Sequence, residues 1–389
     1  MRISDAVRLA VIVVVTCSSI AQEKDNAGAI PVPKGRRIRE IVAEKYPDGH
    51  VWFGGTTGWN KRKGGSGITM DREFSYVTPE NDFKQSTINP KPGVWKWELA
   101  DAWVKHCAEK GQVIRMHGPI SPQSSTWVLT DERTAEELER TLVEFMTLLC
   151  RRYDVVEHIK WMDVVNETVD RKGEWFGPKP GVDKWENPWP KMGFDESHPL
   201  RPPLYIKRAF EIATKEAPHK QLIINQHCNM EPEAWNKIKA LVKYLRDAGL
   251  RVDGIGWQAH INVGFEKNAA DMKVLGELIE WAHANKLSFH VTENNVWLSG
   301  KPKDYEAQAQ TFATIVRVLL EKRKSGVVTW NVWNLSDGDA FSKMADKDGS
   351  LFDRSYQAKP AYYAIQQVLE NPPKVKLRKK LLSRLEFRL

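Results

Sequence analysis

The chain has 389 residues, 41% of them hydrophobic and 10% aromatic, which is enough to bury a large core as one domain. Its net charge of +8 is uneven, because residues 374–389 hold seven basic residues against one acidic residue. The rest of the chain is nearly neutral, which argues against nucleic-acid binding by the protein as a whole. The four cysteines have neither metal-ligand spacing nor a disulfide pattern, so no metal site and no cofactor is expected.

The first predicted element is an export signal over residues 1–21. Two arginines precede an apolar run at 10–15 that is too short to span a bilayer, and Ser19-Ile20-Ala21 offers small residues at the cleavage positions. We therefore expect a secreted or periplasmic protein. Cys17 suggests a lipoprotein, but the residue before it fits that site poorly. No other segment has the length and hydrophobicity of a transmembrane span.

Strand-like and helix-like segments alternate through the middle of the chain. Apolar or β-branched runs predict strands at Val51–Phe53, Phe74–Thr78, Val113–Met116, Ile159–Val165, Leu222–Asn225, Gly254–Gln258, Leu287–Thr292 and Val327–Trp333. Helical patterns lie at Leu99–Lys110, Thr134–Tyr153, Leu204–Glu216, Glu233–Ala248, Ala269–Ala284 and Tyr305–Lys324. The connection after the first strand is too short for a full helix. Eight repeated units of this kind predict an α/β fold, a (β/α)8 TIM barrel forming a single catalytic domain over residues 22–370.

Polar side chains follow seven of the eight predicted strands at the point where each strand ends. They are Glu80, Asn81 and Lys84; His117; Asn166 and Glu167; Asn225 and His227; Gln258 and His260; Glu293 and Asn295; and Trp330 to Asn334. The carboxyl ends of the strands form one face of a barrel, where the chemistry of this fold is located. The spacing therefore predicts a single site at that face.

Two of these strands end on a glutamate, in Trp161–Glu167 and in Ser288–Glu293. A retaining glycoside hydrolase uses two carboxyl groups about 5–5.5 Å apart, one to protonate the leaving oxygen and one to attack the sugar carbon. Glu167 and Glu293 are 126 positions apart, so only the fold can bring them together. The pair predicts hydrolysis of a glycosidic bond.

Several segments resemble glycoside hydrolase family 10, the β-1,4-xylanase family, over roughly residues 50–370. The matching segments are Thr78–Lys84, Asp163–Glu167, Gly254–His260, Val291–Glu293, Gly349–Asp353 and Lys359–Tyr362. The resemblance implies that Glu167 is the acid/base and Glu293 the nucleophile of an enzyme acting on xylan or a related polysaccharide. It also implies a substrate-binding shell made of Glu80, Asn81, Lys84, His117, Asn166, Gln258, His260 and Trp330.

The chain departs from the family pattern around this shell. Ile120–Gln123 stands where the family has Trp-His-Ser-Gln, and Asn295 stands where the family has an aspartate beside the site histidine. An amide stabilises an imidazolium less well than a carboxylate does. After the last strand, Trp330–Asn334 replaces Trp-Gly-x-x-Asp. These changes leave two alternatives open: a hydrolase of another β-glycan such as mannan or glucan, and a non-catalytic carbohydrate-binding protein.

Two further segments each allow two interpretations. The loop over residues 171–203 carries Trp175, Trp185 and Trp189 among seven prolines. These tryptophans are either sugar platforms on the leaving-group side of the cleft or packing residues of an insertion. Residues 371–389 form a basic tail with leucines at mixed three- and four-residue spacings, which is either a helix that contacts an acidic surface or a docked or frayed terminus.

Overall fold

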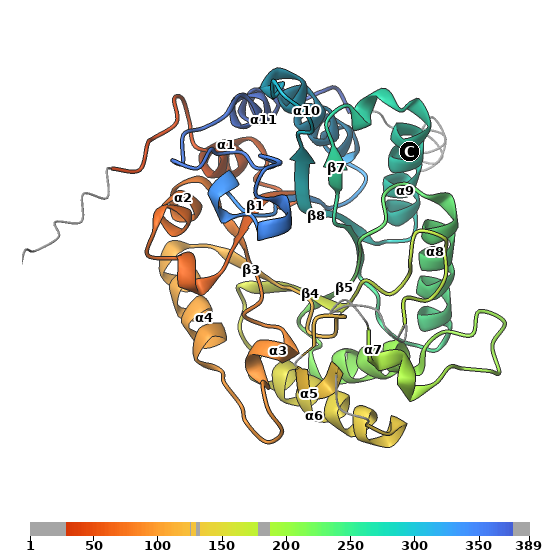
Figure 1. The fold of residues 1–389 in the computed structure, drawn as a ribbon. Helices are drawn as coiled ribbons and strands as arrows, with labels where there is room; N and C mark the ends of the chain where they lie inside the picture. The colour runs from red at the N-terminus through yellow and green to blue at the C-terminus, as the bar shows by residue number, and fades with distance from the viewer. Residues whose placement is uncertain (1–28, 125, 130–132, 178–186, 376–389) are drawn as a thin grey trace, which may run out of the picture.

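The computed structural model describes residues 29–124, 126–129, 133–177 and 187–375. Within them, eight parallel strands close into a barrel that is ringed by helices (Figure 1). These strands are β1 Val51–Thr57, β2 Tyr76–Pro79, β3 Val113–Met116, β4 Ile159–Asn166, β5 Gln221–Gln226, β6 Gly254–Trp257, β8 Ser288–Trp297 and β9 Val328–Val332. The ring closes where β1 pairs with β9, which places Val51 opposite Val328. The predicted (β/α)8 barrel is confirmed.

The predicted helices are present, and further short helices lie between them. The α-helices are α1 Ile38–Lys45, α2 Gly65–Glu73, α3 Gln85–Ile88, α4 Glu98–Lys110, α5 Thr126–Leu129, α6 Ala135–Tyr153, α7 Leu204–Glu216, α8 Pro232–Asp247, α9 Ala269–Ala284, α10 Tyr305–Lys322 and α11 Pro360–Glu370. The 3₁₀ turns are η1 Trp59–Lys61, η2 Trp189–Met192, η3 Phe265–Lys267, η4 Asp337–Asp339 and η5 Ser342–Met344.

Helix α2 occupies the connection after the first strand, where the sequence predicted no room for a full helix. Two of its nine residues are glycines, which weaken any helical pattern in the sequence. Gly67 is required by packing, because a Cβ there would lie 1.7 Å from the Arg62 carbonyl oxygen. The close approach of these two backbones lets the helix fit into the short connection.

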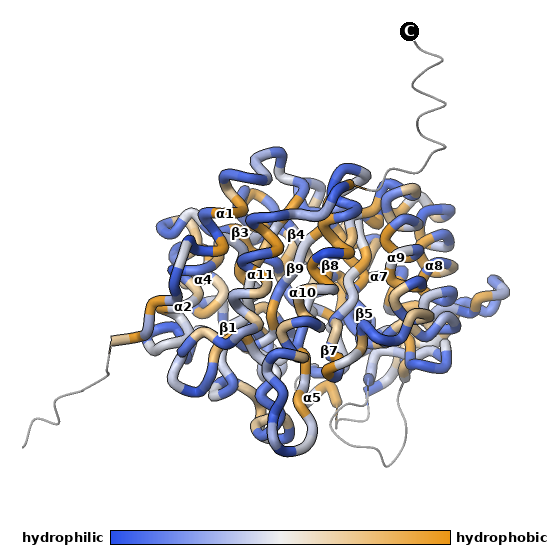
Figure 2. Tube along the Cα trace, turned by 90° about the horizontal axis from the view of Figure 1, so that it is seen from above, coloured by the Kyte–Doolittle hydropathy of each residue, from blue (hydrophilic) through white to orange (hydrophobic). Residues whose placement is uncertain are grey.

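The long helix α6 illustrates how the outer ring forms. Thr134 caps its first turn by accepting from the Glu137 N–H at 3.3 Å, and Glu137 accepts from the Thr134 N–H at 3.0 Å. Its buried face, which includes Leu142, Phe145 and Leu149, packs toward the barrel. Each such side chain contributes about 1.5–3 kcal/mol on burial. Hydrophobic and hydrophilic residues also alternate along the other outer helices (Figure 2).

Large side chains fill the barrel interior at the amino ends of the strands. Tyr76, Trp161 and Ile223 form a buried cluster there, and the His290 ring lies 5.6 Å from the Trp161 ring. The polar residues that the sequence predicted for the site lie at the carboxyl ends, where the strands open. In the part of the chain that the structure describes, no helix has the length and hydrophobicity to cross a membrane.

Local irregularities of the strands shape that open end. The register shifts between Asp163 and Val165 on β4 and between Val291 and Asn294 on β8. Such bulges re-aim side chains near a strand end. A short strand that the sequence analysis missed, β7 His260–Asn262, pairs in parallel with β8 and places His260 opposite Asn295.

Candidate active site

Glu167 lies directly after β4, in a backbone conformation that is unusual for a residue with a side chain. Its φ is 58°, in the left-handed region, which costs on the order of 1–2 kcal/mol for a non-glycine residue. Hydrogen bonds hold this turn in place: the Glu167 N–H donates to the Asn225 carbonyl at 3.0 Å, and the Thr168 N–H donates to Gln226 Oε1 at 3.1 Å. The turn leaves the Glu167 side chain half-buried at the barrel mouth.

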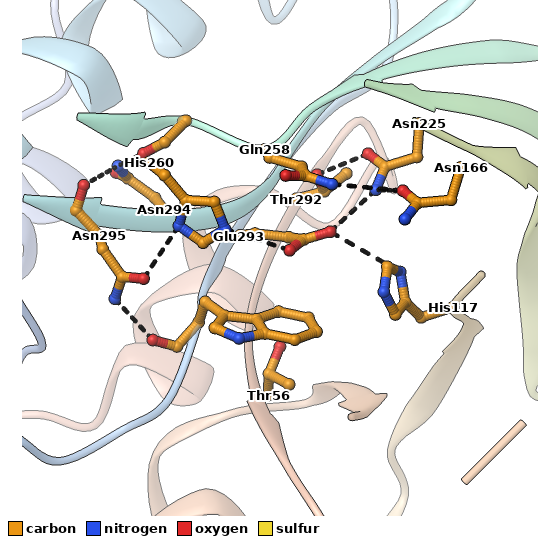
Figure 3. Close-up of polar contacts among 12 residues, drawn as sticks. Thr56, His117, Asn166, Asn225, Gln258, His260, Thr292, Glu293, Asn294 and Asn295 are labelled. Carbon is orange, nitrogen blue, oxygen red and sulfur yellow. Dashed lines mark hydrogen bonds and ion pairs between the residues drawn. The ribbon is translucent and has the colours of Figure 1, made fainter. Parts of the chain in front are cut away.

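Glu293 lies on β8 and is buried, with a separate partner on each carboxylate oxygen (Figure 3). Asn225 Nδ2 donates to Oε1 at 2.9 Å. His260 Nε2 lies 3.3 Å from Oε2, and His117 Nδ1 lies 3.7 Å from Oε1. The carboxylate is therefore fixed in orientation from both sides.

A network of amide side chains joins the two glutamates. Besides Glu293, Asn225 Nδ2 donates to Asn166 Oδ1 at 2.8 Å. Gln258 Nε2 donates to Asn166 Oδ1 at 3.3 Å and to Glu167 Oε1 at 2.9 Å. Asn166 Nδ2 completes the chain by donating to Glu167 Oε1 at 3.2 Å. The structure thus brings the two predicted carboxylates into one hydrogen-bonded site.

The charges around Glu293 favour its ionised form. Burial alone raises the pKa of its carboxyl, but the neighbouring His117, His260 and Arg115 outweigh burial and lower the pKa to about 2. Burial lowers the pKa of Lys84, and the charges of Glu293 and Glu167 oppose that effect. At neutral pH the site therefore presents Glu293 as a carboxylate.

A buried triad lies beneath Glu293. The Arg115 guanidinium donates to Asp163 and, at 2.9 Å, to the Thr292 carbonyl oxygen, while His117 Nδ1 lies 2.9 Å from Asp163 Oδ2. Burial raises the pKa of Asp163 to about 6, although Arg115 opposes it. Burial also lowers the pKa of His117 well below its ordinary value. The contact between His117 Nδ1 and Asp163 fixes the orientation of the His117 ring beside Glu293.

The predicted binding residues after β2 lie at the rim. Glu80 Oε2 is 3.4 Å from Lys61 Nζ, so its charge is partly balanced within the protein. Asn81 is exposed, and buried Lys84 donates to Gln123 Oε1. Burial lowers the pKa of Lys84 and the charges of both Glu293 and Glu167 raise it, which places its ammonium within the field of both carboxylates.

Trp330 lies apart from the polar cluster, contrary to its assignment as a binding residue. It is fully buried, stacks on Phe53 at 5.5 Å, and donates from Nε1 to Asn294 Oδ1 at 2.9 Å. The indole that faces the site is Trp333, whose ring centroid is 5.1 Å from that of His117. The sequence could have identified Trp333, because Trp333-Asn334-Leu335-Ser336-Asp337 matches the Trp-Gly-x-x-Asp pattern better than the segment that begins at Trp330.

The tryptophans of the 171–203 loop do not share one environment. Trp189 is fully buried, and its Nε1 donates to Ser121 O and Ser124 Oγ, so it packs under the loop that follows β3. The Trp175 indole donates to the Leu200 carbonyl at 3.2 Å and is covered by the Lys237 ammonium at 4.8 Å. Trp185 lies outside the described residues. The packing interpretation therefore fits Trp189.

Comparisons with known proteins point to one family. A family model described as glycosyl hydrolase family 10 matches residues 51–368. The chain is 30% identical to endo-1,4-beta-xylanase A of Caldicellulosiruptor saccharolyticus over 76% of its own length and 86% of that protein. It is 28% identical to an endo-1,4-beta-xylanase/feruloyl esterase of Xylanibacter ruminicola, over 76% of its own length but only 42% of that protein.

Solved structures agree with the sequence comparison. Xylanase 10B of Thermotoga petrophila, in complex with xylobiose, superposes with a TM-score of 0.71 at 25% identity, covering 88% of this chain and 99% of that one. Native xylanase 10B of Thermotoga maritima gives a TM-score of 0.68, also at 25% identity, with 86% and 98% covered.

Proposed function

Because this chain belongs to glycosyl hydrolase family 10, we propose that it cleaves β-1,4-linked xylan or a related polysaccharide by double displacement. Glu167 is the acid/base and Glu293 the nucleophile. The observation that carries this proposal is the contrast between the two carboxyl groups. Glu293 is buried, ionised and held on both oxygens, whereas Glu167 is half-buried at the mouth and held through one oxygen by amide donors.

The first step breaks the glycosidic bond. Protonated Glu167 gives its proton to the leaving oxygen while a Glu293 oxygen attacks the anomeric carbon from the opposite face. Asn225 and His260 keep Glu293 aimed, so little reorientation is needed as the ester bond forms. In this proposal, Asn166, which precedes Glu167, donates from Nδ2 to a hydroxyl of the bound sugar.

The second step releases the sugar. Glu167, now a carboxylate, removes a proton from water, and the water oxygen attacks the anomeric carbon and frees Glu293. Esterification has removed the negative charge of Glu293 in the meantime, which changes the field at Glu167 between the two steps. Two inversions at one carbon give net retention of the β configuration.

Removal of each carboxylate tests the proposal. Glu293→Ala should abolish cleavage of xylan and of aryl β-xylobiosides, and added azide should restore aryl glycoside cleavage with an inverted α-azide product. Glu167→Ala should spare the first step for aryl glycosides with good leaving groups, because those need no proton. Glu144→Ala, an exposed change on α6, is the matched control. Equal losses on good and poor leaving groups in Glu167→Ala would contradict the acid assignment.

A panel of purified β-glycans separates the substrate alternatives. Release of reducing sugars from xylan but not from mannan or glucan supports the proposed substrate. Binding without release from any of them favours a carbohydrate-binding protein. Export rests on the pattern of residues 1–21, which lie outside the described residues, and amino-terminal sequencing of the protein recovered from the culture medium tests it.

A further inference from the structure

His260 lies between two groups that each accept a hydrogen bond. Its Nδ1 is 3.0 Å from Asn295 Oδ1, and its Nε2 is 3.3 Å from Glu293 Oε2. The orientation of the Asn295 amide is set by its other end, because Nδ2 donates to the Trp333 carbonyl at 2.6 Å and to the Gly349 carbonyl at 3.3 Å. Oδ1 must therefore point at His260, and His260 Nδ1 must carry a proton.

In this arrangement, the number of protons on His260 decides whether its Nε2 attracts or repels the Glu293 carboxylate. With a single proton on Nδ1, the Nε2 lone pair faces the ionised carboxylate and repels it. With a second proton, Nε2 donates to Oε2 and both contacts are satisfied. Asn295 supplies only an amide dipole, so another group must support the positive charge when Glu293 is esterified and neutral.

An indole ring is in place to do this. The Trp297 ring is stacked on His260 with a centroid distance of 5.5 Å and an interplanar angle of 4°. The face of an indole attracts a cation within about 6 Å. Trp297 is half-buried at the end of β8, where the contact is partly shielded from water.

Other charged groups act on the same pair. The Lys347 ammonium lies 5.3 Å from the Trp297 ring centroid, so a second cation shares this indole. His117, which follows β3, is a second histidine beside the Glu293 carboxylate, the anion that His260 contacts. Lys347 and a charged His117 oppose a positive His260, whereas Glu293 and the Trp297 ring favour it.

We propose that Trp297 is a positioning residue that keeps His260 in its doubly protonated form, through which His260 orients Glu293, and that Lys347 limits this effect. This proposal depends on the proposed function only for the role that it gives to Glu293. The contacts of His260 with Asn295, Glu293 and Trp297 do not depend on that function.

The direct test is titration of His260 by imidazole ¹⁵N chemical shifts, with its signals identified by their loss in His260→Asn. Trp297→Leu should lower the titration midpoint by roughly one pH unit, and Trp297→Phe by less, because a smaller ring keeps part of the attraction. Lys347→Met should move the midpoint in the opposite direction. Trp281→Leu is the control and should leave the midpoint unchanged, because it removes an indole on α9 that is paired with Lys239 of α8.

A rescue experiment separates charge support from packing. In Trp297→Leu, adding Asn295→Asp places a carboxylate at Nδ1 and should raise the midpoint again. Unchanged midpoints in both Trp297→Leu and Trp297→Phe overturn the proposal, and so does a shift that Asn295→Asp fails to reverse. These titrations need no substrate, so they can fail while the enzyme still cleaves xylan, and can succeed if it does not.

The kinetic consequence is specific. On an aryl β-xylobioside, Trp297→Leu should move the high-pH limb of the kcat profile to lower pH by the same interval, with kcat nearly normal on the acidic side. A sugar platform at Trp297 would instead raise KM at every pH and leave the shape of the kcat profile unchanged, which contradicts the positioning role.

Discussion

Replacement of Asn225 by aspartate tests the electrostatic design of the site. Asn225 is fully buried; its Nδ2 donates to Glu293 and Asn166, and its Oδ1 accepts from Thr292 Oγ1 at 2.7 Å. Asn225→Asp keeps the shape of the side chain but replaces the donor on Glu293 with a second carboxylate oxygen at the same position. The two carboxyl groups must then share a proton or repel each other.

The size of the effect follows from the geometry. The atoms now in contact are 2.9 Å apart, which places the two carboxylate charges about 4 Å apart in the variant. At an effective dielectric constant of about 20, their repulsion is about 4 kcal/mol, equivalent to about 3 pKa units. The pair should therefore hold one proton up to about pH 5, whereas the pKa of Glu293 in the native site is about 2.

The assay is kcat/KM against pH on an aryl β-xylobioside. The acidic limb of Asn225→Asp should move upward by about 3 pH units, so that activity at pH 4 falls at least several-fold while activity at neutral pH falls less. Asn187→Asp places the same change at a buried asparagine that donates to Phe176 O and Tyr205 Oη, and its acidic limb should not move. An unmoved limb in a folded Asn225→Asp enzyme would refute the charge argument.

Three further outcomes follow. The pKa of Glu293 lies below its ordinary value of 4.5, so ionised Glu293 stabilises the fold at higher pH and this stabilisation is lost as the pH falls. The free energy of unfolding, measured by urea denaturation, should therefore fall by roughly 2 kcal/mol less between pH 5 and pH 3 in Glu293→Gln than in the unchanged protein. Trp189→Ala should cost about 3–5 kcal/mol of stability, seen in Tm, and reduce activity equally on polymer and aryl glycoside. Trp330→Leu should lower Tm with little change in KM, whereas Trp333→Leu should lower kcat/KM with a smaller change in Tm.

The sequence predicted the strands well because all eight are short apolar runs and seven of them end in a polar cluster. Predicted and observed bounds coincide for Val113–Met116 and differ at one end by a single residue for Ile159–Asn166. The run at β8 extends to Trp297, further than predicted, because Asn294 and Asn295 find partners in neighbouring loops instead of ending the strand. Polar residues in a strand look like a turn when their partners are distant in sequence.

The site was predictable as a set of residues but not as a set of contacts. Motif spacing identified Glu167 and Glu293, and the structure places them in one network. Trp297 was missed as a site residue, and Asn225 and Trp333 were predicted at strand ends without a role, because the importance of each depends on which neighbour its side chain meets. Trp297 stacks on His260 only because the register of β7 sets His260 beside the end of β8. Pairing of that kind leaves no periodic signal in the sequence.

The left-handed backbone at Glu167 has a consequence for engineering. A glycine at this position would adopt a φ of 58° without steric cost, so Glu167→Gly removes the backbone strain and the proposed acid/base together. Selection for heat resistance alone would therefore favour loss of the proposed acid/base, so that stability and turnover are traded against each other at one residue. Libraries built on this barrel should be sorted by activity after heating, so that this route to higher stability is eliminated at the first round.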